Sequence, residues 1–91
     1  MMVRYAGRAT GRVQGVGFRA FVEGAAHDMG FTGWVKNMPD GSVTMEVQGA
    51  EADFPALKAR IEAGNDWIEV TALAWEPCPC VPEETSFTIR R

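Results

Sequence analysis

The segment GRVQGVGFR, residues 11–19, marks the place where the periodicity of the sequence changes. Before it, residues 3–13 alternate between apolar and polar side chains, a pattern typical of a half-buried strand. From Phe18 onward, apolar residues recur at intervals of three and four, which places them on one face of a helix that Gly30 would end. The segment therefore predicts a strand, a glycine-rich loop and a helix in direct succession.

The rest of the chain carries further periodic segments. The turn signal PDG separates two apolar stretches, which predicts a hairpin with a loop at residues 37–41. Pro77, Pro79 and Pro82 predict an interruption of regular structure before a short closing strand. The predicted segments are strands at 34–36, 42–48, 68–75 and 86–90, and an amphipathic helix at 51–63.

These elements follow the order strand, helix, strand, strand, helix, strand, with one strand added at the end. Two βαβ-type halves of this kind fold as an antiparallel sheet with both helices on one face, the ferredoxin-like split βαβ sandwich. We therefore expect an α+β fold and a single domain spanning residues 1–91. Proteins of this shape bind many different ligands, so the fold alone does not predict the function.

Composition limits the classes of protein to which the chain can belong. It has 91 residues, 46% of them hydrophobic and 23% charged, with a net charge of −3. No apolar run approaches the roughly 20 residues of a membrane helix, and the N-terminal segment lacks the apolar core of a signal peptide. We therefore expect a cytoplasmic protein without a membrane partner, and a monomer by default. The negative charge also argues against nucleic-acid binding.

Basic residues are concentrated at the start of the chain. Arg4, Arg8, Arg12 and Arg19 lie within the first 19 residues, which contain no Asp or Glu. A negatively charged protein with a locally positive segment suits a small anion better than a polyanion. For Arg4 and Arg8, a solvated strand face is a sufficient explanation.

The chain offers few ligands for a metal. Cys78 and Cys80 are its only cysteines, and His27 is its only histidine. A structural zinc site is therefore not expected. We expect two free thiols in a reducing compartment, a structural or solvent-facing histidine, and no metal or other cofactor.

The glycine-rich loop before the helix is suited to binding an anion. Small residues let successive backbone N–H groups turn toward a common centre, and the first N–H groups of a helix have no internal partner. Arg19 adds donors suited to phosphate oxygens, although the helix dipole disfavours a cation there unless an anion shares the site. The residues alone leave open a plain connection with a surface arginine. The glycine spacing matches neither the P-loop nor the dinucleotide-binding fingerprint.

Asn37 is a second candidate site residue, at the end of the predicted strand in GWVKNMPDG, residues 33–41. Its amide both donates and accepts, so it can hold a water molecule and an oxyanion at once. A turn asparagine that stabilises its own backbone is the commoner case. The residue taken alone does not distinguish these two roles.

At these two loops the sequence resembles the acylphosphatase family. The family signature Gly-x-Val-Gln-Gly-Val-x-Phe/Tyr-Arg stands here as GRVQGVGFR, and Gly-Trp-Val-x-Asn with a following Asp-Gly turn stands as GWVKNMPDG. The end of the chain, TSFTIRR, is similar to the closing Phe-x-Ile-Arg strand of the family. The resemblance covers nearly the whole chain, but region 50–82 shares only the helix-then-strand pattern. Met38 and the CPC at residues 78–80 depart from the family pattern.

The resemblance implies a metal-independent hydrolase that splits an acyl phosphate into a carboxylate and inorganic phosphate. It implies that backbone N–H groups of residues 14–19 hold the phosphoryl oxygens, that Arg19 binds the same group, and that Asn37 positions the attacking water. The catalytic residues would be Arg19 and Asn37. The implied phosphate-binding residues are Gln14, Gly15, Val16, Gly17, Phe18 and Arg19. The implied partner is a small acyl phosphate substrate.

Two other functions remain open at this point. An acylphosphatase-like domain can be a non-catalytic, acyl or carbamoyl phosphate-binding accessory unit, as in hydrogenase-maturation carbamoyltransferases; the presence of both Arg19 and Asn37 favours the enzyme. A ferredoxin-like RNA-binding domain would need exposed aromatic residues on the sheet and a basic face. We instead expect Trp34, Trp67 and Trp75 in the core or at its edge.

Overall fold

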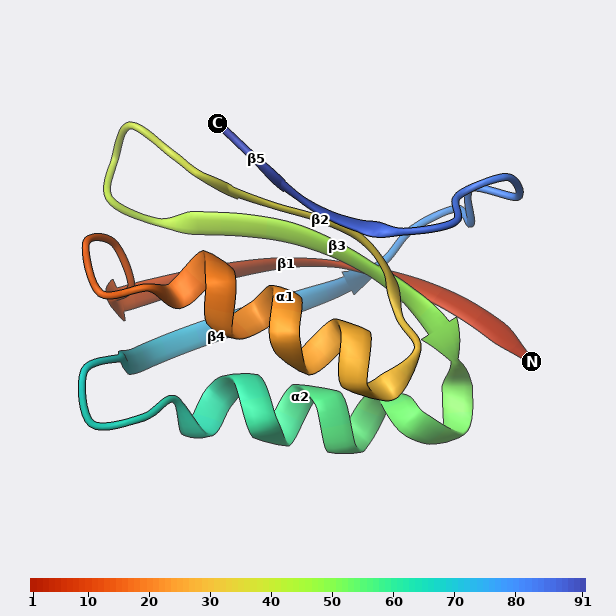
Figure 1. Cartoon of the computed structure of the whole chain (residues 1–91), viewed down its shortest axis with the longest axis horizontal. Coiled ribbons are helices and arrows are strands. Elements are labelled where there is room, and N and C mark those ends of the chain that lie inside the picture. The colour runs from red at the N-terminus through yellow and green to blue at the C-terminus, as the bar shows by residue number, and fades with distance from the viewer.

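The computed structural model describes all residues, 1–91, as five β-strands and two α-helices (Figure 1). Every predicted element is present. Strand β4 extends past its predicted end to Pro77. An edge strand tolerates proline because a residue whose N–H would face solvent donates no hydrogen bond to a neighbouring strand. The elements are β1 (Met2–Arg12), α1 (Phe18–Met29), β2 (Thr32–Asn37), β3 (Val43–Ala50), a 3-10 turn η1 (Glu51–Asp53), α2 (Phe54–Ala63), β4 (Glu69–Pro77) and β5 (Phe87–Arg90).

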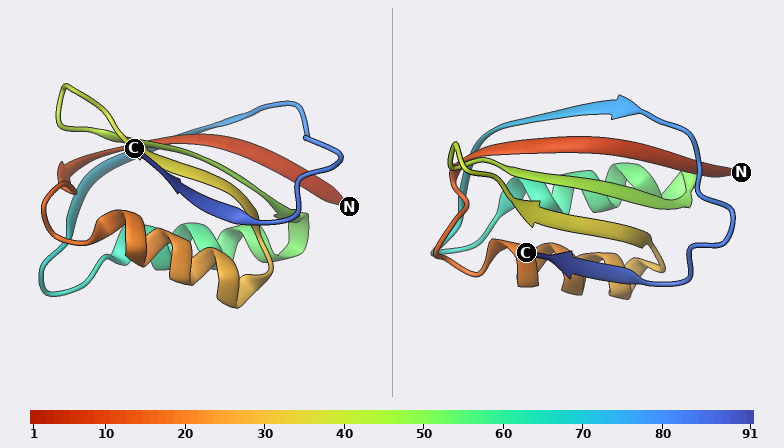
Figure 2. Two further views of the ribbon diagram at one scale, coloured as in Figure 1. Left: turned by 45° about the horizontal axis from the view of Figure 1, so that its top comes forward. Right: turned by 90° about the horizontal axis from the view of Figure 1, so that it is seen from above.

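The strands form one sheet in the order β4-β1-β3-β2-β5, and both helices cover the same face (Figure 2). The predicted α+β, ferredoxin-like fold is confirmed, with one difference in the sheet. The first four strands of that order are antiparallel, whereas β5 is parallel to β2. The β4–β5 connection, residues 78–86, leaves β4 and enters β5 at the same end of the sheet, so β5 runs opposite to β4 and alongside β2.

The hydrophobic core lies between the helices and the covered face of the sheet. The predicted helical periodicity is confirmed, since the buried residues of α1 and α2 recur at helical spacing. Alternate residues of β3 point into the same layer. The fully buried side chains of these elements include Phe18, Val22, Leu57, Ile61, Val43, Met45 and Val47.

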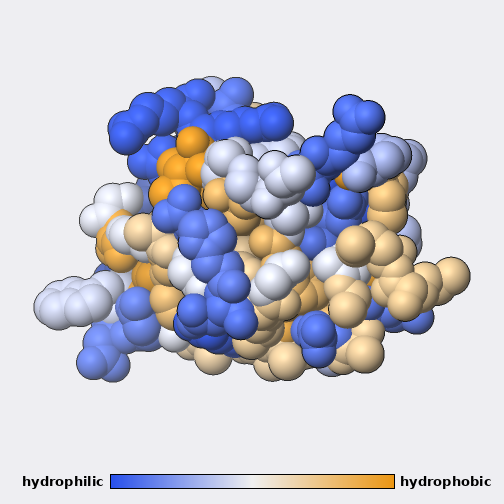
Figure 3. Space-filling view, turned by 45° about the vertical axis from the view of Figure 1, so that its right-hand side comes forward, coloured by the Kyte–Doolittle hydropathy of each residue, from blue (hydrophilic) through white to orange (hydrophobic).

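Few large apolar side chains remain outside this core. The face shown in Figure 3 is a mosaic of hydrophilic and hydrophobic residues rather than one apolar surface. Trp75 packs against the core, as predicted. The prediction is wrong for Trp34, which is half-buried on the helix-free face of the sheet, and for Trp67, which is 72% exposed in the α2–β4 loop. His27 is solvent-facing, as predicted. The large exposed apolar residues are Met1, Met2, Trp67 and Val81.

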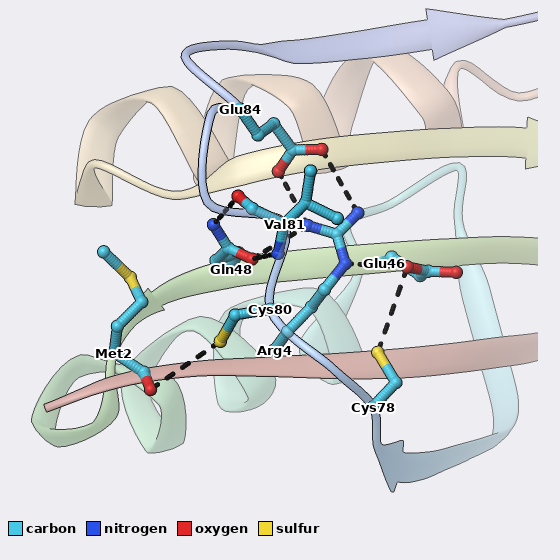
Figure 4. A network of polar contacts seen from close by, with 8 residues as sticks. All are labelled: Met2, Arg4, Glu46, Gln48, Cys78, Cys80, Val81 and Glu84. Carbon is cyan, nitrogen blue, oxygen red and sulfur yellow. Dashed lines mark hydrogen bonds and ion pairs between the residues drawn. The ribbon is translucent and has the colours of Figure 1, made fainter.

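Arg4 holds the β4–β5 connection against the helix-free face of the sheet (Figure 4). Its guanidinium donates to both carboxylate oxygens of Glu84, at 2.8 and 3.1 Å, and to Oε1 of Glu46 at 2.7 Å. The prediction of a solvated side chain is therefore wrong for Arg4, which is only 3% exposed. It is correct for Arg8, whose half-exposed side chain pairs with Asp40.

The ion pair between Arg4 and Glu84 predicts a pH-dependent stability. Burial opposes ionisation of Glu84, but hydrogen bonding to Arg4 and Thr32, together with the charges of Arg4 and Arg90, outweighs it and holds the pKa of Glu84 below its usual value. A lowered carboxyl pKa stabilises the fold above the unfolded-state pKa of about 4.3, and this contribution is lost as the pH falls through the lower, folded-state pKa.

We expect Glu84→Gln to lower the free energy of unfolding by about 1–3 kcal/mol at pH 7, because it weakens a charged hydrogen-bonded pair. The difference from wild type should shrink below about pH 4. Urea denaturation at pH 7 and pH 3 measures both effects. Glu83→Gln, at the exposed neighbouring position, is the matched control; an equal loss in this variant would assign the effect to net charge.

Candidate active site

The loop between β1 and α1 has the backbone conformation needed to turn N–H groups toward one point. Gly15 and Gly17 have φ angles of 74° and 78°, in the left-handed region that side chains disfavour. Gly17 is the N-cap of α1, but no side chain caps the helix and its first turn contains no acidic residue. The first N–H groups of α1 are therefore available to an external acceptor.

Gln14 fixes this loop against the loop that follows β2. Its Nε2 donates to the carbonyl oxygens of Met38 and Ser42, at 2.8 and 2.9 Å. The second loop is closed internally, because Oδ1 of Asp40 accepts from the backbone N–H and the hydroxyl of Ser42. These bonds, together with the guanidinium of Arg8, hold the pKa of Asp40 well below its usual range. The two predicted site loops thus form one hydrogen-bonded unit.

A cavity of about 230 Å³ lies at this junction. It brings together five of the predicted site residues. The other two do not line it: the side chain of Gln14 joins the loops, and Val16 packs against the core. Ile89 and Arg91 line it without having been predicted, since no local pattern indicates where the end of the chain folds back. The lining residues are Val13, Gly15, Gly17, Phe18, Arg19, Ala20, Asn37, Ile89 and Arg91.

Arg19 supplies an uncompensated positive charge to the cavity. None of the salt bridges of the structure involves it. Its Nη1 donates to the carbonyl oxygen of Arg90, at 3.2 Å, and the cavity is lined by no Asp or Glu side chain. Because a guanidinium carries five N–H donors, one bond to a carbonyl leaves most of its donors for an anion.

Asn37 lines the same cavity from the end of β2. Its Oδ1 is buried, and no protein group donates a hydrogen bond to it. A buried acceptor without a partner costs about 1–3 kcal/mol, so a fold retains one where another role requires it. The position beside an anion-binding loop suits an acceptor for a water molecule.

The structure contains neither a cluster of metal ligands nor a helix suited to crossing a membrane. No group of three or more His, Cys, Asp and Glu side chains is arranged to hold a metal ion. No helix has both the length and the apolar character to span a membrane.

Known proteins resemble this chain in sequence and in fold. The family model described as Acylphosphatase matches residues 5–89. An acylphosphatase of Clostridium beijerinckii is 38% identical over 89 residues, covering 98% of this chain and 99% of the relative. The crystal structure of acylphosphatase from Bacillus subtilis superimposes with a TM-score of 0.92 at 32% identity, covering all of both chains.

A likeness to a much larger protein is also clear. Full-length HypF, crystallised in a phosphate- and nucleotide-bound form, matches with a TM-score of 0.85 and 29% identity. The match covers the whole of this chain and only 12% of the HypF chain. The family model and the relatives of similar length agree over nearly the whole sequence. The chain belongs to the acylphosphatase family, whose members are enzymes that hydrolyse acyl phosphates.

Proposed function

We propose that the cavity at the β1–α1 loop is the active site, where the carboxyl–phosphate bond of an acyl phosphate is hydrolysed without a metal ion. The observation that carries this proposal is that one cavity is lined by Arg19, by Asn37 and by two glycines with left-handed backbone conformation, Gly15 and Gly17. The products are a carboxylate and inorganic phosphate.

The phosphoryl group is held by the backbone N–H groups of residues 14–19 and by Arg19. The helix terminus adds a fixed positive potential, and the guanidinium adds charge-assisted hydrogen bonds to two oxygens at once. Phosphoryl transfer depends mainly on placement and on stabilising the charge of the equatorial oxygens. Fixed N–H groups and one arginine supply both without further groups.

Asn37 orients the attacking water through its buried Oδ1, while its N–H groups face the phosphoryl oxygens. Phosphorus is attacked in line with the departing oxygen, and the P–O bond to the acyl group breaks with its electron pair. Because a carboxylate is a good leaving group, no general acid is needed. The proton of the water passes to an oxygen of the substrate phosphate, since no carboxylate or histidine lines the cavity.

Replacing Gly15 tests the backbone cradle. A side chain would meet no atom within 4 Å, so the expected damage comes from the left-handed φ of 74° and not from a collision. A β-branched residue there costs at least about 1–2 kcal/mol, and the loop should relax away from the anion-binding shape. We expect Gly15→Val to weaken inorganic phosphate binding at least about tenfold. Gly24→Ala, in the exposed middle of α1, should leave affinity unchanged; an unaffected Gly15→Val variant would rule out the cradle.

The protein is expected to act as a cytoplasmic monomer with no nucleic-acid partner. The net charge of −3 supports the absence of a nucleic-acid partner. Light scattering measures whether the protein is a monomer. Salt-dependent binding of single-stranded RNA would contradict the absence of a nucleic-acid partner.

The experiment that tests the proposal is hydrolysis of benzoyl phosphate with EDTA present and, separately, with Mg²⁺. Equal and rapid turnover in both conditions supports the metal-independent enzyme. The likeness to one part of HypF motivates the alternative, an accessory domain that binds an acyl or carbamoyl phosphate without hydrolysing it. A folded protein that binds inorganic phosphate but does not turn over benzoyl phosphate would favour that alternative.

A further inference from the structure

Trp34 and Arg90 form a contact that the hydrolysis chemistry does not use directly. The guanidinium carbon of Arg90 lies 4.6 Å from the centre of the Trp34 ring, and Arg90 is also the residue whose carbonyl oxygen accepts from Arg19. We infer that Trp34 and Arg90 are a positioning pair that fixes the Arg90 carbonyl and thereby orients the guanidinium of Arg19. This inference rests on the proposed phosphate-binding role of Arg19.

The two residues lie on the helix-free face of the sheet. In the β2–β5 register, Val35 is buried and pairs with Ile89, which packs against the core, so the alternate positions Trp34 and Arg90 point to the opposite face. The side chain of Arg90 is thus held on one face of β5, while its carbonyl oxygen receives Arg19 from the active-site cavity.

The end of β5 needs such an anchor. The strand has four residues, lies at the edge of the sheet and pairs with β2 alone. Terminal residues of edge strands fray when few contacts hold them. The stacking of a guanidinium on an indole ring adds a second attachment to β2, worth about 0.5–1 kcal/mol at an exposed position, which corresponds to a factor of about two to five in an equilibrium.

Strand β2 would then position both catalytic side chains, Asn37 directly and Arg19 indirectly. Asn37 is its last residue, and Trp34 lies three residues earlier on the same strand. Through Trp34 and Arg90, the same strand sets the position of the carbonyl that orients Arg19. The bulky aromatic residue on the helix-free face has this explanation, whereas a role in the core does not apply to it.

The test removes each partner separately and measures Arg19 directly. In Trp34→Leu and Arg90→Met, we expect the Arg19 Nε–Hε NMR signal of the ligand-free protein to show higher mobility. Titration with inorganic phosphate should show affinity about fivefold weaker in each variant. The double variant should lose no more than either single one, because both act through one contact. Trp34→Phe and Arg90→Lys should restore most of the affinity, since each keeps a cation over a ring.

Lys36→Met is the matched control. Lys36 pairs with Arg90 in the register and lies on the same face as Trp34, so this variant removes one positive charge from that face. The cation over the Trp34 ring is Arg90, which the variant keeps. Equal weakening in this variant would assign the effect to net charge and overturn the inference. Additive losses in a double variant of Arg19→Ala with Arg90→Met would also overturn it, because the pair would then not act through Arg19.

Failure of the proposed function and failure of this inference have different signatures. A wild-type protein that neither binds phosphate nor hydrolyses benzoyl phosphate contradicts the proposed function, while the Arg19 signal still reports on the pair. An Arg19 signal of unchanged mobility in Trp34→Leu and Arg90→Met overturns the inference, whatever the activity. Urea denaturation of each variant identifies any loss that is due to unfolding.

Discussion

Arg19→Ala is expected to lower kcat/KM for benzoyl phosphate by at least about a thousandfold, because an arginine that stabilises phosphoryl-transfer charge is worth about 10³–10⁵ in rate. The same variant should bind inorganic phosphate far more weakly than wild type. Steady-state kinetics and a phosphate titration measure the two effects. Arg19 lines the cavity from the first turn of α1, and no salt bridge compensates its charge.

Stability should barely change in this variant. Arg19 is partly exposed and forms a single hydrogen bond, to a carbonyl oxygen, at 3.2 Å. A cation in the first turn is disfavoured by the helix dipole, which offsets the loss of that bond. The buried face of α1, with Val22 and Ala25, is untouched. We expect the free energy of unfolding to stay within about 0.5 kcal/mol of wild type.

Two further variants separate the geometry of Arg19 from its charge. Arg19→Lys keeps the charge but loses the planar pair of donors, so activity should fall to an intermediate level. Arg12→Ala removes a positive charge from an exposed position just before the same loop and should leave kcat/KM within about threefold of wild type. An Arg19→Ala protein that is unfolded at room temperature would assign the residue to the structure instead.

The parts of the site that local sequence patterns predicted are those built from consecutive residues. The change of period at Phe18 predicted the helix start. The glycines before it predicted a loop whose N–H groups can turn toward one point, a shape that the positive φ angles of Gly15 and Gly17 allow. Asn37 ends β2, a strand that was predicted at residues 34–36 from the turn signal that follows it. These features depend on contacts between near neighbours.

The features that escaped prediction depend on partners far apart in the chain. Arg4 is buried because Glu84, 80 positions later, folds back across the sheet to meet it. Gln14 serves the loop after β2 through contacts 24 and 28 positions away. A strand pattern predicts which side chains share a face, but it does not predict which distant segment will cover that face. The parallel pairing of β5 has the same origin.

Asn37→Ala is expected to lower kcat by about 10²–10³, the usual cost of removing one preorganised hydrogen-bonding group from an active site. Phosphate affinity should change less than about threefold, because the glycine loop and Arg19 remain. Loss of hydrolysis with retained phosphate binding is the result expected if the main role of Asn37 is to orient the water and its contact with the phosphoryl oxygens adds little to affinity. Asn37→Asp keeps the shape of the side chain but replaces the N–H donors with a negative charge, so it should also be nearly inactive. Undiminished turnover in Asn37→Asp would exclude an amide that orients water.

The structure offers a matched asparagine with the opposite expected behaviour. Oδ1 of Asn65 accepts from the backbone N–H groups of Trp67 and Ile68, at 2.8 and 3.0 Å, whereas Oδ1 of Asn37 accepts from no protein group. Asn65→Ala should therefore destabilise the fold by about 1 kcal/mol and leave kcat intact. Asn37→Ala should leave the urea midpoint unchanged or raise it, since it removes a buried acceptor that the fold does not satisfy. Loss of stability in Asn37→Ala equal to that in Asn65→Ala would mean that Asn37 serves the turn after β2, and the water would need another acceptor.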